Sequence, residues 1–390
     1  MLAAEVHDAI RSISRAFADD RRGRQRRTGL DVEDFARLRD AGLLKAGLPT
    51  DRGGLWERVE TSARPISEIY RMLAGADSSV ALVCSMHPAV LAFWLATHDV
   101  PAPDSDAWTR QRAAIFDTVE EGAWWGTITS EPGSGGDVRL TRARAEPSSD
   151  GRWRITGQKH FGSGSGITSY MLTTAVPDGE ERPDWFYVPV SDVTLEDTDG
   201  LSIAAPWEGH GMQATQSHAL TFDRCRAERV AWPGHLDELI AAAAPFFGTL
   251  FTAVVLGIVE TAVDAARALL APRAGTLRAY EQVEWAQAEL EAWTMAQVYE
   301  GALVAIESGH PAAGASLRAK TIAAQLAESA LLRICRVVGG GTFARGSPFG
   351  NWFEDVRALG FLRPPWALAY DALIADTWSP TIGPARSSGV

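Results

Sequence analysis

The pattern of hydrophobic residues changes twice along this chain, and that change limits the fold more than any other feature. Up to about residue 108, apolar residues recur every three or four positions, as on one face of a helix. Between about residues 124 and 222, short β-rich runs such as 185–190 are separated by Gly, Pro, Asp and Ser. Long Ala/Leu-rich segments return after about residue 236. We therefore expect an α+β protein.

Three domains are predicted from this pattern. They are an N-terminal helical domain over residues 1–122, a small β-barrel or sheet domain over 123–232, and a C-terminal four-helix bundle over 233–390. The most apolar run, residues 245–259, is shorter than the roughly 20 residues that a membrane-spanning helix needs. It is expected to form a buried helix, and residues 386–390 are expected to be frayed.

Charge and cysteine usage narrow the range of partners. The formal net charge of -12 is spread along 390 residues without long runs of like charge, so binding to nucleic acid is not expected. The three cysteines are scattered without CxxC spacing, and the first ten residues are acidic and amphipathic, unlike a secretory signal. We expect a cytoplasmic protein with no membrane association and no metal site.

The densest cluster of glycine and hydroxyl residues lies at 127–137, where a β-rich run ends. Glycine allows backbone N–H groups to approach an anionic or heterocyclic ligand closely. A plain hairpin loop would explain Gly133, Gly135 and Gly136 about as well. Neither this loop nor residues 162–166 have the spacing of a dinucleotide-binding fingerprint. The loop by itself therefore does not identify a ligand.

Order and spacing add specificity. Residues 130–137 (SEPGSGGD) are followed by 157–163 (GQKHFGS) and by 211–217 (GMQATQS). Together they resemble the T-E-P-G-x-G-S-D, G-x-K-x-W-I-T-N and L-G-M-R-x-T-x-S segments of the acyl-CoA dehydrogenase superfamily. The flanking helical regions are similar too, so the resemblance extends over essentially the whole chain. It implies the acyl-CoA dehydrogenase fold, a flavin cofactor and a homo-oligomer, commonly a homotetramer.

The resemblance also implies which residues contact the flavin. Thr129 and Ser130 would hydrogen-bond its pyrimidine edge, while Phe161 and Ser163 would lie against the ring near the reactive N5. A strand-capping serine and a core phenylalanine are the alternatives at positions 163 and 161. At Gly136 the family usually has serine, so one hydroxyl contact is lost and an acyl-CoA substrate becomes less expected.

Further flavin contacts are implied in the third domain. Arg273 aligns with an arginine that reaches the flavin pyrophosphate of a neighbouring subunit, although the family's R-x-T-F-G reads RAGTL here. Gly339 and Gly340 align with a Gly-Gly turn beside the adenine end of a neighbouring subunit's FAD. An exposed arginine and a helix C-cap are the alternatives. The expected cofactor is FAD, with FMN as the other candidate.

The catalytic glutamate of the family's dehydrogenases is missing. These enzymes remove an α-proton with a carboxylate, and the two helix positions known to supply it align with Arg363 and Phe247. Neither can act as a base, because phenylalanine has no basic group and arginine remains protonated. Arg363 would instead bind a substrate carboxylate or stabilise an oxyanion.

Loss of this glutamate is shared with the superfamily's flavin monooxygenases, which use oxygen and take reduced flavin from a separate reductase. Residues 161–166 (FGSGSG) are similar to the F-x-S-G run of those enzymes, and 85–88 (SMHP) to their helix with an active-site histidine. This resemblance implies that His87 transfers a proton. A histidine satisfied inside the core is the alternative.

Three functions follow. The first is a monooxygenase or oxidase acting on a small or carrier-bound metabolite, with catalytic residues His87, Ser163 and Arg363 and a flavin reductase or other electron-transfer partner. The second is an acyl-CoA or acyl-carrier-protein dehydrogenase whose base has moved to Asp371 or Glu260. The third is a non-catalytic scaffold, either flavin-binding or flavin-free.

Overall fold

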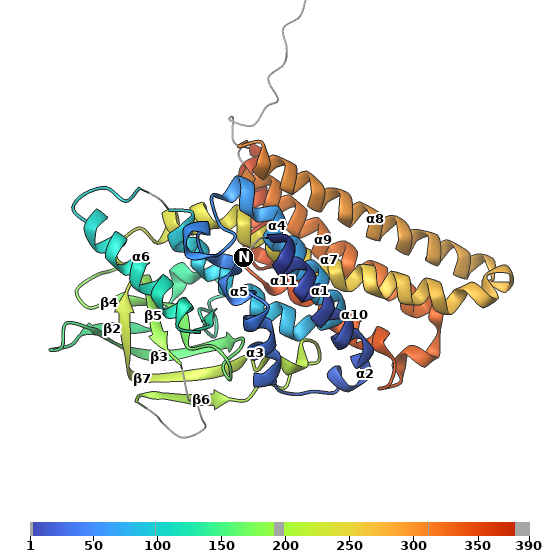
Figure 1. The fold of residues 1–390 in the computed structure, drawn as a ribbon, viewed down its shortest axis with the longest axis horizontal. Coiled ribbons are helices and arrows are strands. Elements are labelled where there is room, and N and C mark those ends of the chain that lie inside the picture. Colours follow the sequence, from blue (N-terminus) through green and yellow to red (C-terminus); the bar gives the residue numbers. More distant parts are fainter. Residues whose placement is uncertain (1–2, 98, 191–198, 311, 379–390) are drawn as a thin grey trace, which may run out of the picture.

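The computed structural model describes residues 3–97, 99–190, 199–310 and 312–378. Helices, a β domain and helices again follow one another along the chain, which confirms the expected α+β order (Figure 1). Residues 386–390, expected to be frayed, lie outside the described residues.

The N-terminal region is helical, and its last long apolar helix has no solvent-facing side. Helix α5 is buried at every position from Ser79 to Leu95 because it packs against α4, α7 and strand β1. Asp77 begins it, its carboxylate accepting a hydrogen bond from the Val80 N–H at 2.9 Å. The helices of this region are α1 (Ala3–Asp19), α2 (Arg21–Arg24), α3 (Val32–Asp40), α4 (Val59–Ala76), α5 (Ser78–Leu95) and α6 (Ser105–Glu120).

The β domain is a small closed barrel. Each strand pairs with the next in the order β2, β3, β7, β5, β4. The last of these, β4, also pairs with β2, so the ring of strands closes. Strand β1 extends from β4, and β6 extends from β7. Closure leaves room inside only for side chains such as Ile155, Phe186 and Phe222. The strands are β1 (Trp125–Thr127), β2 (Arg144–Pro147), β3 (Trp153–Gly162), β4 (Tyr170–Pro177), β5 (Asp184–Pro189), β6 (Leu201–Ala205) and β7 (His218–Arg229).

The C-terminal region is a bundle of long helices. Helix α7 packs on α8 and α9, and the short α10 lies against α7 and α9. The apolar run 245–259 falls within α7 and is largely buried, as expected. By length and composition alone α5 and α7 could cross a membrane, but both are mostly covered by protein. The helices are α7 (Leu236–Leu270), α8 (Ala279–Glu307), α9 (Ala312–Val338), α10 (Pro348–Val356), α11 (Ala358–Phe361) and α12 (Trp366–Trp378).

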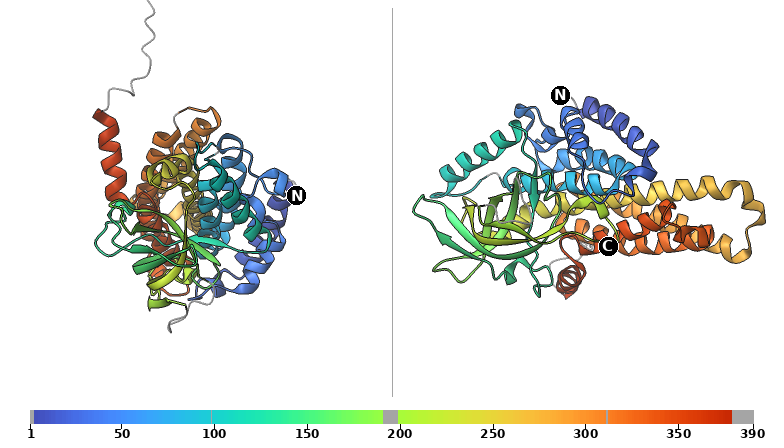
Figure 2. Two further views of the ribbon diagram at one scale, coloured as in Figure 1. Left: turned by 90° about the vertical axis from the view of Figure 1, so that its left-hand side faces the viewer. Right: turned by 90° about the horizontal axis from the view of Figure 1, so that it is seen from below.

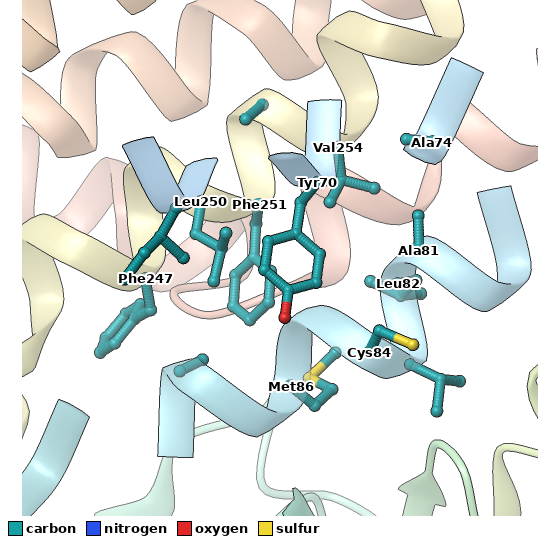
Figure 3. Close-up of a cluster of buried hydrophobic side chains, with 14 of the residues drawn as sticks. Tyr70, Ala74, Ala81, Leu82, Cys84, Met86, Phe247, Leu250, Phe251 and Val254 are labelled. Carbon is teal, nitrogen blue, oxygen red and sulfur yellow. The ribbon is translucent and has the colours of Figure 1, made fainter. Parts of the chain in front are cut away.

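Two views of the ribbon show how these parts meet. The barrel lies at one end of the molecule and the long helices extend away from it, with α5 and the first half of α7 between them (Figure 2). Tyr70 of α4 stands between Leu82 and Met86 of α5 and Phe247 and Phe251 of α7 (Figure 3). The helical side of this junction is therefore formed by buried hydrophobic side chains.

Candidate active site

A cavity of about 1380 Å³ lies at this junction, large enough for a flavin ring together with a small substrate. Its inner wall is apolar and is formed mainly by Leu82, Met86, Val90 and Phe93 of α5 and Ile240, Ala244, Phe247 and Phe251 of α7. The opposite wall comes from loops of the barrel and includes Thr129, Ser130, Gly133, Gly135, Gly136, Phe161, Ser163, Trp207 and Ser217. The three segments that carry the family resemblance therefore reach one cavity.

The glycines of the 130–137 loop have backbone conformations that favour glycine. Gly133, Gly135 and Gly136 have φ angles of +82°, +60° and +85°. A Cβ atom added at Gly136 would lie 2.8 Å from Cγ of Pro365. Glycine at position 136, where the family usually has serine, therefore lets the segment after α11 approach the loop closely.

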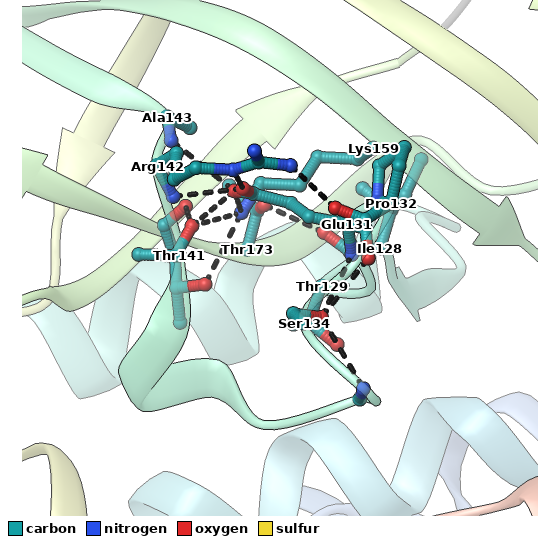
Figure 4. A network of polar contacts seen from close by, with 12 residues as sticks. Ile128, Thr129, Glu131, Pro132, Ser134, Thr141, Arg142, Ala143, Lys159 and Thr173 are labelled. Atoms are coloured by element: carbon teal, nitrogen blue, oxygen red, sulfur yellow. Dashed lines mark hydrogen bonds and ion pairs between the residues drawn. The ribbon is translucent and has the colours of Figure 1, made fainter.

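Glu131 fixes this loop to the barrel. Its carboxylate pairs with Nζ of the fully buried Lys159 at 2.7 Å, and accepts hydrogen bonds from the Thr141 hydroxyl and the Arg142 N–H (Figure 4). Burial acts to raise the pKa of Glu131, but Lys159 and Thr141 outweigh it and hold that pKa below its ordinary value. Glu131 is therefore a satisfied anion that holds the loop.

The end of β3 presents an aromatic ring to the cavity. Phe161 has a φ of +62°, a left-handed conformation that is uncommon for residues other than glycine. Its side chain is 58% exposed, and its ring meets that of Trp207 edge to face with 6.1 Å between centroids. Phe161 is therefore a cavity residue and not part of the barrel core.

Ser163 lies beside Phe161 and belongs to a chain of hydroxyl groups. Its Oγ is 2.8 Å from Oγ of Ser217, which is 2.7 Å from Oγ1 of Thr215. The Thr215 hydroxyl donates to the carbonyl oxygen of Met212 at 2.8 Å. The second and third motif segments thus touch through side-chain hydrogen bonds.

Arg363 lies in the segment between α11 and α12 and contacts the 130–137 loop and the residue before it, Thr129 and Ser130 being adjacent in sequence. Its Nε donates to Oγ1 of Thr129 at 3.0 Å, its Nη2 donates to the same oxygen, and its Nη1 donates to the carbonyl of Gly136 at 2.7 Å. Burial lowers the pKa of Arg363 to about 10, so it remains a cation at neutral pH. Arg363 and Thr129, which were predicted separately, are therefore in direct contact. Ser130 is held next to them by its backbone, because its carbonyl accepts a hydrogen bond from the N–H of His160 in β3.

Lys320 of α9 supports the same segment, and the sequence comparison did not predict it. Its Nζ donates to the carbonyls of Leu362 at 2.9 Å and Pro364 at 2.5 Å, and burial lowers the pKa of Lys320 to about 8. Within the described residues, no carboxylate forms an ion pair with Lys320 or Arg363. The only sequence signal was a lysine among the small residues of a helix.

His87 does not lie in the cavity. Its Nε2 donates to the carbonyl of Leu44 and its Nδ1 accepts from the Trp125 N–H, both at 2.9 Å. Burial lowers the pKa of His87 to about 3, despite the opposing hydrogen bond to Leu44. With both ring nitrogens occupied inside the core, His87 holds β1 to the helical region. This placement gives no support to the expected proton transfer.

The two carboxylates considered as relocated bases lie in different places. Glu260 of α7 pairs with Arg71 of α4 and does not line the cavity, so the structure contradicts its proposed role. Asp371 lines the outer part of the cavity from the exposed side of α12. Phe247 occupies the inner wall at one expected base position.

Arg273, Gly339 and Gly340 do not line the cavity. Arg273 donates to the carbonyl of Val337 at 2.8 Å and pairs with Glu281 at 3.4 Å. Gly339, with φ +94°, ends α9, and its N–H donates to the carbonyl of Cys335. The segment after α7 and the end of α9 thus meet at the end of the bundle that points away from the barrel (Figure 1). Any contact with flavin would have to involve another copy of the chain.

The closed barrel between two helical regions, with three motif segments at one cavity, defines a protein with the acyl-CoA dehydrogenase fold. Residues 126–225, which contain all three motif segments, match the middle domain of the acyl-CoA dehydrogenases.

Relatives of known sequence and structure span nearly all of the chain. It is 27% identical over 374 residues to the amino sugar nitrososynthase DnmZ of Streptomyces peucetius, covering 90% of this chain and 86% of that protein. It is 26% identical over 371 residues to the putative acyl-CoA dehydrogenase YdbM of Bacillus subtilis, with coverages of 90% and 89%. The structure of FMN-bound TdsC from Paenibacillus sp. A11-2 superposes with a TM-score of 0.77 at 21% identity, covering 96% of this chain and 97% of TdsC.

Proposed function

We propose that this protein is a flavin-dependent oxidoreductase, and within that class an oxygen-using monooxygenase or oxidase acting on a small, largely apolar molecule. The observation that carries the proposal is the composition of the cavity wall. Phe247 and Arg363 stand at the two expected base positions, and the inner wall around Phe247 is made of apolar side chains. Desaturation of a thioester needs a carboxylate beside the α-carbon, and this wall offers none among the described residues.

The cavity fits a flavin. The 130–137 loop exposes backbone without side chains at its glycines, and Thr129, Ser130 and Phe161 line the same wall. We propose that these groups hold the pyrimidine edge and one face of the ring, with Ser163 beside N5. Bound flavin would supply electron transfer and, when reduced, reactivity toward oxygen. The identity of the flavin released from purified protein distinguishes FMN from FAD.

The protein's own residues would then have separate roles in binding, orientation and positioning. The apolar inner wall binds the body of the substrate and excludes water, since apolar surface gains roughly 25 cal/mol for each Å² removed from water. Arg363 orients an anionic or carbonyl group of the substrate at the outer end. His87 contributes only by positioning β1 through its bond to Trp125.

Oxygen chemistry with supplied reduced flavin tests this proposal. The protein, mixed with FMN, NADH and a separate flavin reductase, is expected to form an oxygenated product from at least one member of a panel of aromatic and aliphatic compounds. Boiled protein with the same reductase is the control for uncatalysed oxidation. A protein that binds flavin but yields no oxygen-dependent product across the panel would contradict the proposal.

A dehydrogenase is the second candidate, and Asp371 is the observation in its favour because it lines the cavity. Anaerobic bleaching of bound oxidised flavin by an acyl thioester, lost in Asp371→Asn, would establish this activity. A purified protein that binds neither oxidised nor reduced flavin would instead leave the scaffold hypothesis.

We also propose a cytoplasmic homo-oligomer that obtains electrons from a separate reductase. Helix α8 has exposed apolar side chains spaced along its length, namely Tyr280, Val283, Leu290, Trp293 and Val304. Such a stripe is typical of a helix that packs against a further protein surface. A second copy could also bring Arg273 to the flavin. Light scattering of the purified protein measures the number of copies.

A further inference from the structure

The contact between Thr215 and the Met212 carbonyl favours one direction for the hydroxyl chain that runs from Ser163 to Met212. A carbonyl oxygen carries no hydrogen, so the 2.8 Å contact between Oγ1 of Thr215 and the Met212 carbonyl uses the single hydroxyl hydrogen of Thr215. The 2.7 Å contact between Thr215 and Ser217 must then use the hydrogen of Ser217. By the same count, the 2.8 Å contact between Ser217 and Ser163 uses the hydrogen of Ser163.

The direction determines what Ser163 offers to the cavity. Because its only hydrogen points at Ser217, the Ser163 oxygen turns lone pairs toward the space that it lines. A ligand atom in contact with it is therefore favoured when it donates a hydrogen bond. An acceptor at that place would lose its hydrogen bond or force the whole chain of hydroxyls to reverse.

The surrounding backbone keeps the chain of hydroxyls in place. Thr215 is fully buried, and Ser163 and Ser217 are 8% and 7% exposed. Met212 donates its N–H to the carboxylate of Asp355 at 2.6 Å, and Oε1 of Gln216 accepts from the Leu30 N–H at 3.1 Å. Met212 and Gln216, which flank the turn at residues 213–215, are thus bonded to α10 and to the N-terminal region, respectively.

We propose that this chain of hydroxyls makes the site selective for reduced flavin. The inference rests on the proposed function, in which Ser163 lies beside N5. Reduced flavin carries a hydrogen on N5 and can donate to Ser163, whereas N5 of oxidised flavin is an acceptor. Thr215 and Ser217 are then specificity-determining residues that act through Ser163, and they suit an enzyme that receives its flavin already reduced.

Thr215→Val and Ser217→Ala test the direction. Each removes the acceptor that orders the chain, so Ser163 becomes free to turn its hydrogen to the cavity. In anaerobic titrations, the ratio of the Kd for oxidised FMN to the Kd for reduced FMN is expected to fall about fivefold, the net worth of one neutral hydrogen bond. The potential of bound flavin should fall correspondingly by about 20 mV, at roughly 30 mV per tenfold for two electrons.

Two matched variants control for disturbance of the buried turn. Thr215→Ser keeps the hydroxyl and should retain the wild-type ratio. Thr168→Val removes a neighbouring buried hydroxyl that donates only to the carbonyl of Gly164, and should also leave the ratio unchanged.

The outcomes separate this inference from the function on which it rests. A fall in the ratio in both test variants and not in the controls supports it. Flavin binding with the same ratio in wild type, Thr215→Val and Ser217→Ala overturns the inference and leaves the proposed function standing. If the wild-type protein binds neither oxidised nor reduced flavin, both the inference and the proposed function are overturned.

Discussion

Two lysines are buried near the cavity, and they differ in what surrounds them. Lys159 and Lys320 are 0% and 2% exposed, and burial lowers the pKa of each to about 8. Lys159 faces the carboxylate of Glu131, whereas among the described residues Lys320 donates to the carbonyls of Leu362 and Pro364 and pairs with no carboxylate. Arg363, between those two carbonyls in sequence, adds a second cation to the same segment.

The difference separates a structural cluster from one suited to a ligand. Around Glu131 the charges cancel and the hydrogen bonds are complete, so the cluster holds the 130–137 loop and needs nothing further. Around Arg363 two cations share one segment, and no carboxylate among the described residues forms an ion pair with either. Burial lowers the pKa of Arg363, and the nearby carboxylate of Asp137 opposes this only in part. Such an arrangement leaves positive charge for an anionic group of a substrate or cofactor.

The largest expected effect is loss of stability on Lys159→Met. This change leaves Glu131 buried without its cation, and breaking a buried ion pair in this way typically costs about 3–5 kcal/mol. Urea unfolding measures the loss. The double variant with Glu131→Gln should recover most of it, because the unpaired charge is then gone. A single variant as stable as wild type would show that the Glu131 cluster is not structural.

A somewhat smaller effect is expected for Lys320 at alkaline pH. Between its folded-state pKa of about 8 and the ordinary value of 10.5, the unfolded chain holds a proton that the folded protein has released. Stability therefore rises with pH across this window, and is independent of this group below it. Relative to Lys320→Met, wild type should gain up to about 3 kcal/mol from pH 8 to 10.5.

Unfolding curves at several pH values give this comparison. Lys159 titrates in both proteins, so its contribution cancels. Parallel stability profiles for wild type and Lys320→Met would mean that Lys320 keeps an ordinary pKa, and that the two lysines do not differ as described.

The smallest expected effect concerns ligand affinity. Arg363→Gln removes the cation but keeps a donor, and should raise the KM of a substrate with a carboxylate about tenfold, since charged hydrogen bonds contribute about 1.5–3 kcal/mol. Arg357→Gln is the control, because Arg357 also lines the cavity but already pairs with Glu354 at 2.7 Å. An unchanged KM for the acidic substrate in Arg363→Gln would remove the role in anion binding.

Much of the fold and part of the site could be predicted from the sequence. The alternation of helical and β patterns indicated the α+β order, and the three motif segments indicated that Thr129, Phe161 and Ser163 belong to one site. The α+β order is confirmed, and the three residues line one cavity. Motif spacing reflects local backbone geometry, such as the positive φ angles at Gly133 and Phe161.

The rest depends on long-range contacts that spacing does not reveal. Helix α5 is apolar on every side, so its sequence gives no direction for His87, and the ring faces Leu44 and Trp125 instead of the cavity. Lys320 is 42 residues from Leu362, and only the packing of α9 against α11 brings them together.

Helix α5 also limits how substrate preference can change in evolution. The residues that it gives to the cavity, such as Leu82 and Met86, belong to a helix without any surface face. A substitution that reshapes the pocket there also repacks the interior, and large-to-small changes in a core commonly cost about 2–5 kcal/mol. New specificities should therefore arise more readily from α12, whose exposed side chains can vary without disturbing the interior.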